Sequence, residues 1–190
     1  MATTSLKITF TLDEKDLAYF RDLFKKVKRS GARLDALRVS ADVKALIDRV
    51  RKAKKVPSFV EEAMANLETL VEMLGDEDYA LPAKIAHEVL AAVAYFSNPQ
   101  DLVPDHVPGL GYLDDAIMIK FLEDQFQHEL AGYQKFCRFR EGANVLPWAE
   151  GADARLAKRL AEKRKEIRAE IARREAGGGS RTRLRDIIRW

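Results

Sequence analysis

Four aspartates on a short proline-rich stretch are the residues of this chain whose type and spacing best suit chemistry. Asp101 and Asp105 lie among prolines, and Asp114 and Asp115 follow closely. Carboxylate oxygens are the ligands that Mg²⁺ and Ca²⁺ prefer, so Asp101, Asp105 and one residue of the later pair, Asp115 or Asp114, are candidate metal ligands. Adjacent helical residues diverge by about 100°, so the pair is not expected to share one ion. The spacing matches no EF-hand loop.

A structural role explains the same carboxylates and is the favoured interpretation. Pro99, Pro104 and Pro108 each fix φ and disfavour helix in the preceding residue, so the connection is predicted to be rigid and free of helix. Aspartates in such a segment accept main-chain hydrogen bonds, and acidic residues in the first turn of a helix gain about 0.3–1 kcal/mol each from its dipole. We therefore expect these aspartates to hold the corner of a helical hairpin.

The whole stretch from residue 98 to residue 115 forms one pattern, N-P-x-D-L-x-P-D-x-x-P-G-x-G-Y-L-D-D. With this pattern the sequence resembles the YkvA-like family, also catalogued as domain of unknown function 1232, over about residues 80–120. The resemblance implies an all-helical module with a fixed turn between helices, and it carries over no catalytic role. The motif residues are Asn98, Pro99, Asp101, Pro104, Asp105, Pro108, Gly109, Gly111, Tyr112, Asp114 and Asp115.

The elements that must position this turn follow from the spacing of apolar residues, which is helical along most of the chain. An extended segment is expected at residues 6–12. We predict an all-α fold, a bundle of about five to six helices in which the Pro/Asp turn joins a central hairpin of two partner helices. The predicted helices span about residues 11–31, 40–55, 58–75, 82–98, 112–140 and 152–176.

Local signals suggest how some of these helices begin and pack. Ser40 is the expected cap of the second helix, and Ser58 with Glu61 has the spacing of a capping box for the third. The helix at 152–176 is highly charged but carries one narrow apolar stripe, which requires a groove to lie in. That stripe consists of Leu156, Leu160, Ile167 and Ile171.

Charge is segregated along the chain although the net charge is only +3. Residues 1–60 carry 15 Lys/Arg against 7 Asp/Glu, residues 61–150 carry 5 against 17, and residues 151–190 carry 13 against 6. The favoured interpretation is that the basic arms pack beside the acidic centre and partly neutralise it. The alternative is that they form an exposed surface for nucleic acid or anionic lipid.

Three regions are predicted from this pattern. Residues 1–145 form a helical domain, residues 146–176 a charged helix, and residues 177–190 a flexible linker and basic tail. The tail is a candidate for docking on a partner or on an anionic membrane surface, with an unstructured end as the alternative. Its candidate docking residues are Arg181, Arg183, Arg185, Ile187, Ile188 and Trp190.

Several classes of protein are disfavoured. The longest apolar run, residues 89–96, is far shorter than the roughly 20 residues of a membrane-spanning helix. The N-terminal residues lack a secretory signal, and the single cysteine, Cys137, is expected to be a buried, inert thiol. These features predict a bacterial-type cytoplasmic protein, with peripheral attachment to a membrane as the alternative. His87 and His128 are expected on exposed helix surfaces.

The sequence thus favours a non-enzymatic interaction or scaffolding module with a protein partner. No dinucleotide fingerprint, P-loop or HExxH motif is present, and no cofactor is predicted. One alternative is a metal-dependent enzyme or metal-binding protein that uses the turn aspartates to hold a divalent cation. The other is binding of nucleic acid or of an anionic membrane surface through the basic arms.

Overall fold

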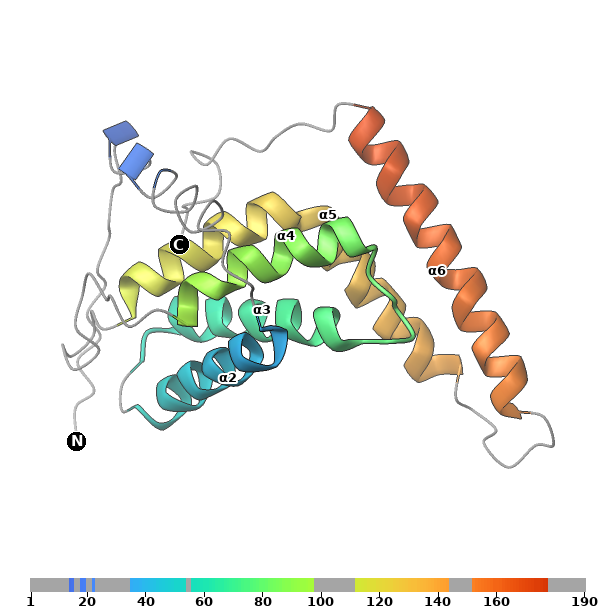
Figure 1. Ribbon diagram of the computed structural model, residues 1–190, viewed down its shortest axis with the longest axis horizontal. Coiled ribbons are helices and arrows are strands. Elements are labelled where there is room, and N and C mark those ends of the chain that lie inside the picture. The colour runs from blue at the N-terminus through green and yellow to red at the C-terminus, as the bar shows by residue number, and fades with distance from the viewer. Residues whose placement is uncertain are drawn as a thin grey trace, which may run out of the picture.

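A computed structural model describes residues 14–15, 18–19, 22, 35–53, 56–97, 112–143 and 152–177, and every regular element within these residues is helical. The predicted all-α fold is therefore confirmed (Figure 1). The elements are α2 (Ala36–Lys52), α3 (Ser58–Gly75), α4 (Ala83–Val93), the short 3-10 helix η1 (Ala94–Ser97), α5 (Leu113–Ala143) and α6 (Ala152–Ala176).

Two of the predicted helix caps are wrong. Helix α2 begins after Asp35, whose Oδ1 accepts the backbone N–H groups of Leu37 at 3.0 Å and Arg38 at 3.3 Å. Ser40 lies inside the helix, because the earlier aspartate already satisfies the free N–H groups of the first turn. Helix α3 begins at Ser58 itself, and its N-cap is Pro57, which makes no side-chain capping bond.

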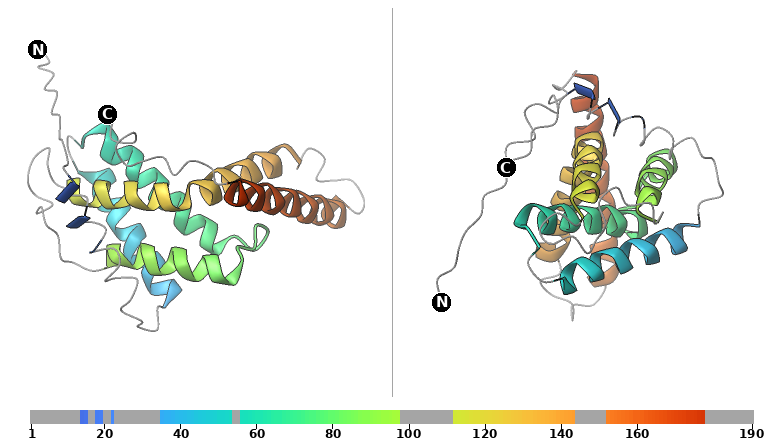
Figure 2. Two further views of the ribbon diagram at one scale, coloured as in Figure 1. Left: turned by 90° about the horizontal axis from the view of Figure 1, so that it is seen from above. Right: turned by 90° about the vertical axis from the view of Figure 1, so that its left-hand side faces the viewer.

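Helix α3 is the centre of the bundle. Its buried residues are apolar along its whole length, and α2, α4 and α5 all pack against it. The prediction that α4 and α5 are direct packing partners is wrong: these two helices make few contacts with each other, and each lies across α3 instead (Figure 2). The apolar face of α3 is broad enough to serve both neighbours, so the hairpin is held together through a third helix.

Helix α5 is bent, and the bend separates its two roles. Phe126 has non-helical dihedral angles, with φ −108° and ψ 18°, and its side chain is buried. The half before Phe126 runs beside the bundle, whereas the half after it extends beyond the bundle and carries α6 (Figure 1).

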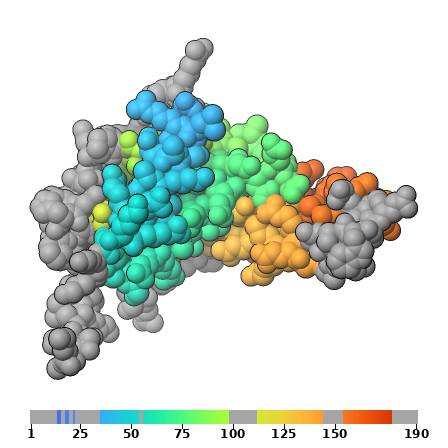
Figure 3. All heavy atoms as spheres, turned by 90° about the horizontal axis from the view of Figure 1, so that it is seen from below, coloured from blue at the N-terminus to red at the C-terminus, as the bar shows by residue number. Residues whose placement is uncertain are grey.

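Helix α6 runs back along the second half of α5 and has the bounds that the sequence predicts. Leu160, Ile167 and Ile171 are buried, and Leu156 packs against the same cluster at its edge. The predicted stripe is therefore confirmed, and its groove is the second half of α5. Helices α2 and α6 lie at opposite ends of the molecule (Figure 3).

In the described parts of the basic arms, ion pairs agree with the prediction that these arms pack on the acidic centre. Arg51 of α2 pairs with Glu68 of α3 at 2.6 Å, and Arg168 of α6 pairs with Glu129 of α5 at 2.5 Å. None of the described helices combines the length and the apolar character that crossing a bilayer requires.

Candidate functional site at the junction of α5 and α6

Only the end of the predicted turn motif lies in the part of the chain that the structure describes. Asp114 and Asp115 stand in the first turn of α5, as predicted, but both are buried, with only 4% and 7% of their surface exposed. Tyr112, which precedes them, is also buried and has a left-handed φ of 66°.

The other turn residues, Asp101 and Asp105 among them, lie outside the described residues, as does the whole docking tail from Arg181 to Trp190. Among the residues that are described, no group of three or more His, Cys, Asp or Glu side chains is placed to hold a metal ion. The metal site and the tail contact stay predictions.

The predicted surroundings of the histidines and the cysteine are correct in part. His87 is exposed on α4, as expected, but His128 is half-buried. Cys137 is also half-buried rather than fully enclosed, because it lies at the edge of α5 beside Arg140, whose Nη2 is 3.8 Å from the sulfur.

The structure brings polar groups together at one junction. There the second half of α5, helix α6 and the connection from α3 to α4 meet. We call this set of side chains the junction cluster. It consists of Asp76 and Tyr79 from the connection, Glu129, Tyr133 and Arg140 from α5, and Arg168 from α6.

Asp76 organises the first half of the junction cluster. Its Oδ1 accepts the backbone N–H of Tyr79 at 2.9 Å, and its carbonyl accepts the N–H of Ala80, which has a left-handed φ of 44°. Its Oδ2 accepts the Tyr133 hydroxyl at 3.0 Å and the Arg140 guanidinium at 2.8 Å. A left-handed alanine costs about 1 kcal/mol or more, so these bonds hold the turn in a shape that directs Tyr79 inward.

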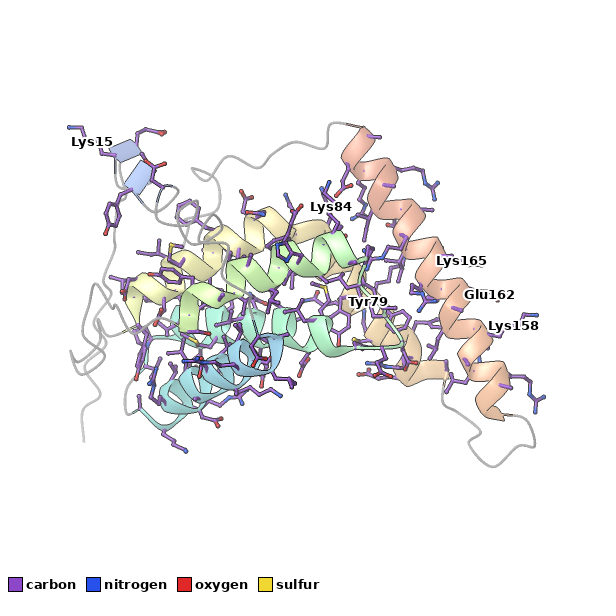
Figure 4. The ribbon with its side chains drawn as sticks, viewed as in Figure 1. Lys15, Tyr79, Lys84, Lys158, Glu162 and Lys165 are labelled. Atoms are coloured by element: carbon purple, nitrogen blue, oxygen red, sulfur yellow. The ribbon has the colours of Figure 1, made fainter. Side chains whose placement is uncertain are left out.

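Tyr79 fills the space between the bundle and α6 (Figure 4). Its side chain has no exposed surface, and its ring meets those of Tyr133 and Phe136 with centroids 5.0 Å and 5.3 Å away. The guanidinium of Arg168 lies 4.5 Å from the ring centroid, where the electron-rich face of the ring attracts a cation.

The second half of the junction cluster is a buried ion pair. Glu129 keeps only 4% of its surface exposed, and its Oε2 accepts Arg168 Nη1 at 2.5 Å and the Tyr79 hydroxyl at 3.4 Å. Within the described residues, Glu129 Oε1 and the Nε and Nη2 atoms of Arg168 are buried without a hydrogen-bond partner. The pair thus joins α6 to α5 through one of the two bonds that an arginine and a carboxylate are able to form.

The two tyrosines of the junction cluster act as hydrogen-bond donors, because their pKa values are raised. Burial raises the pKa of both tyrosines above the usual value. The nearby Glu129 raises the pKa of Tyr79 further, and Cys137 and Asp76 raise that of Tyr133 further. Both phenols therefore stay protonated and donate to carboxylates. Burial alone would raise the pKa of Asp76, but the Tyr79 N–H, Arg140 and Tyr133 together hold it below its usual value.

Replacing Asp76 by asparagine tests this arrangement through its pH dependence. A depressed pKa means that the carboxylate stabilises the fold above the pKa of the unfolded chain, and that this stabilisation is lost as pH falls through the folded pKa. Bonds to a charged group contribute about 1.5–3 kcal/mol, so we expect Asp76→Asn to lose about that much at pH 7. Urea unfolding should show the deficit shrinking below about pH 4, near the usual aspartate pKa. A deficit that is constant with pH would contradict the ionised role of Asp76.

The sequence analysis missed the junction cluster. Tyr79 and Glu129 are 50 residues apart, and Glu129 and Arg168 are 39 apart, so no local spacing links them. A usable signal was present on α5, where Glu129 stands on the apolar face between Phe126 and Tyr133. A charged residue on such a face calls for a partner of opposite charge.

Comparison with known proteins finds a similarity at the centre of the chain. Residues 88–121 match the profile of the family described as Protein of unknown function (DUF1232). The chain therefore carries a segment similar to this family, between the end of α4 and the first half of α5.

A curated protein of Bacillus subtilis (strain 168), the Uncharacterized membrane protein YkvA, is similar to this chain. The two are 37% identical over 46 residues, which cover 24% of this chain and 43% of that protein. The match thus spans less than half of the relative's length. No solved structure matches the chain.

The junction cluster lies outside the matched segment. Asp76 and Tyr79 precede residue 88, and the cluster residues of α5 and α6 follow residue 121. The family segment contributes the first half of α5, whereas the second half and α6 add a separate structural unit to it.

Proposed function

We propose that this chain is a non-enzymatic interaction module that docks on an acidic partner surface through the outer face of α6. The observation that carries the proposal is the position of α6. Among the described helices it packs extensively only against α5, through an apolar stripe and the charged side chains beside it, and its opposite side faces away from the bundle. Figure 1 shows it at the edge of the molecule.

The outer face of α6 is charged and mostly basic. The exposed residues of the whole helix include six basic side chains against three acidic ones, of which Arg159 and Glu166 contact Phe139 and Lys135 of α5. Lys158, Glu162 and Lys165 follow one another along the side that points away from the bundle (Figure 4). The basic residues are Arg155, Lys158, Arg159, Lys165, Arg173 and Arg174, and the acidic ones are Glu162, Glu166 and Glu175.

The chemistry of the junction cluster supports a structural role rather than catalysis. Its phenols stay protonated because their pKa values are raised, and Asp76 is held by three donors. Glu129 is engaged by Arg168 and enclosed between helices. These groups fix α6 on α5, and a fixed helix presents its outer face without further ordering cost on binding.

An anionic membrane surface is the second candidate partner. The Bacillus relative is named a membrane protein, and basic side chains near an anionic surface contribute about 1 kcal/mol each. Peripheral attachment through α6 requires no membrane-spanning helix. Nucleic acid receives less support, because α2 and α6, the two described helices with an excess of basic residues, lie at opposite ends of the molecule (Figure 3).

Reversing two charges on the outer face tests the proposal. The Lys158→Glu/Lys165→Glu chain should bind its partner at least about tenfold more weakly, because two favourable contacts of about 1 kcal/mol each become repulsive. The matched control is Lys44→Glu/Lys84→Glu, which makes the same change of net charge at exposed positions of α2 and α4.

Both variants should be compared with the parent chain in quantitative pull-downs and in sedimentation with phosphatidylglycerol vesicles. Loss of protein capture with the α6 variant alone supports the acidic protein partner, and loss of vesicle binding alone supports the membrane. Equal behaviour of the two variants in both assays would refute docking through α6.

A further inference from the structure

The face of α5 beneath α6 is built to recognise one particular helix. We call it the α6 groove and define it by Glu129, Gly132, Lys135 and Phe139 of α5. At Gly132 a Cβ atom would lie only 2.9 Å from Ile171 Cδ1 and 3.0 Å from Ile167 Cγ2, so this glycine opens the space that both isoleucines enter.

Charges on both sides of Gly132 fix the register of the bound helix. Glu129 pairs with Arg168 at 2.5 Å, and Lys135 pairs with Glu170 at 2.6 Å. Further along, Lys163 of α6 lies over the Phe139 ring, 5.4 Å from its centroid. The α6 groove therefore selects a helix with isoleucines four positions apart and with an arginine and a glutamate at fixed positions between them.

Helix α6 has the properties of a separable ligand for this groove. Its composition is dominated by Ala, Glu, Lys and Arg, which are strong helix formers. It also contains its own ion pairs, Lys163 with Glu166 at 2.8 Å and Glu170 with Arg174 at 2.7 Å. A helix of this kind keeps much of its structure when it leaves the groove.

The docking of α6 on its own chain is also imperfect. Glu129 Oε1 and two nitrogens of Arg168 are buried without a hydrogen-bond partner among the described residues. Each such group costs about 1–3 kcal/mol, which lowers the free energy that holds α6 in place.

We propose that the α6 groove binds α6 of a second copy of this chain, so that two copies exchange these helices reciprocally. The second copy supplies the same isoleucines, arginine and glutamate in the same register, and so matches the groove in shape and charge. Exchange of an identical element is a low-cost route to a dimer. It would present two outer faces on one particle, so the inference deepens the proposed function and rests on it.

Charge exchange between two full-length variants tests this inference. The Glu129→Arg chain and the Arg168→Glu chain each place like charges in the junction, both within a copy and between identical copies. In a mixture, reciprocal exchange restores both opposite-charge pairs at once. Close charge pairs at interfaces couple by about 1.5–7 kcal/mol, so the mixed dimer should form with a Kd at least about tenfold below that of either variant alone.

The readout is analytical ultracentrifugation of each variant, of the mixture and of a chain that carries both substitutions. The doubly substituted chain restores the pair within one copy and should regain the protection of α6 against hydrogen exchange. A mixture that forms no mixed dimer, beside a double variant whose α6 is protected, would overturn the inference. The proposed function would survive that result, because it is tested separately by the Lys158 and Lys165 reversals.

Two substitutions that change side-chain size or polarity in the groove and in α6 test exchange without reversing charges. Gly132→Leu blocks the groove and leaves α6 intact, whereas Ile167→Asp disables α6 and leaves the groove intact. Circular dichroism first checks that each chain keeps its helical bundle. Mixing them should then produce a one-to-one complex that neither chain forms alone, and a mixture that stays monomeric would contradict exchange.

Discussion

Replacing Arg168 by alanine will lower the free energy of unfolding by about 3 kcal/mol, because removing one partner of a buried ion pair leaves an uncompensated charge that costs about 3–5 kcal/mol. The carboxylate left behind is Glu129, whose side chain is 5% exposed, and Arg168 itself is 22% exposed, so we expect the lower end of that range. Urea unfolding followed by circular dichroism measures the change.

Two controls separate this effect from a general loss of charge on α6. Arg174→Ala removes an exposed pair with Glu170 and should cost less than about 0.5 kcal/mol. Replacing Glu129 and Arg168 together by methionine removes both charges and should recover most of the loss, since a buried pair is often no more stable than apolar residues of similar size. An Arg168→Ala chain as stable as Arg174→Ala would contradict the role of this pair.

The second large effect is expected at Tyr79, where alanine should destabilise the chain by about 3–5 kcal/mol, as loss of a fully buried aromatic ring does. This side chain contacts Tyr133, Phe136 and Arg168 at the same time, so its removal leaves a cavity between α5 and α6. Thermal and urea unfolding provide the measurement.

Phenylalanine at the same position is the matched comparison. Tyr79→Phe keeps the ring and removes only the hydroxyl, whose bond to Glu129 is long at 3.4 Å, so the cost should be about 1 kcal/mol or less. If both substitutions had the same effect, the hydroxyl rather than ring packing would hold the junction, and the account of Tyr79 would be wrong.

Helix type and extent were largely predictable where periodicity is strong. The bounds of α6 follow from an uninterrupted charged pattern with one apolar stripe, and its stripe is buried as expected. Helix starts were harder, because more than one residue near a start is able to cap it. Asp35 caps α2 ahead of Ser40, and the buried Val39 then belongs to the first turns of the helix.

Partner choice among helices was not predictable from the apolar faces alone. The pattern identifies faces on α4 and α5 that must be covered, but it does not say by which neighbour. Helix α3 covers both, and α5 additionally receives α6 after its bend at Phe126. A short connection between two helices therefore did not imply that they pack directly on each other.

The candidate site was less predictable than the fold, because it depends on contacts between distant residues. The carboxylates of the Pro/Asp turn stood out by their spacing, yet the described polar contacts with the clearest geometry join Asp76 to Arg140 and Glu129 to Arg168. Two local features of α5 pointed there: a glutamate on an apolar face and Gly132 in the interior of a long helix, where glycine costs about 1 kcal/mol relative to alanine.

Site-specific photocrosslinking in cells shows whether α6 contacts a partner through its outer face. A photoreactive amino acid replaces Lys165 on the outer face of α6 in one full-length chain and His87, exposed on α4, in another. We expect a discrete protein or lipid adduct from position 165 and none from position 87. No adduct at position 165, or the same adducts from both positions, would contradict this contact.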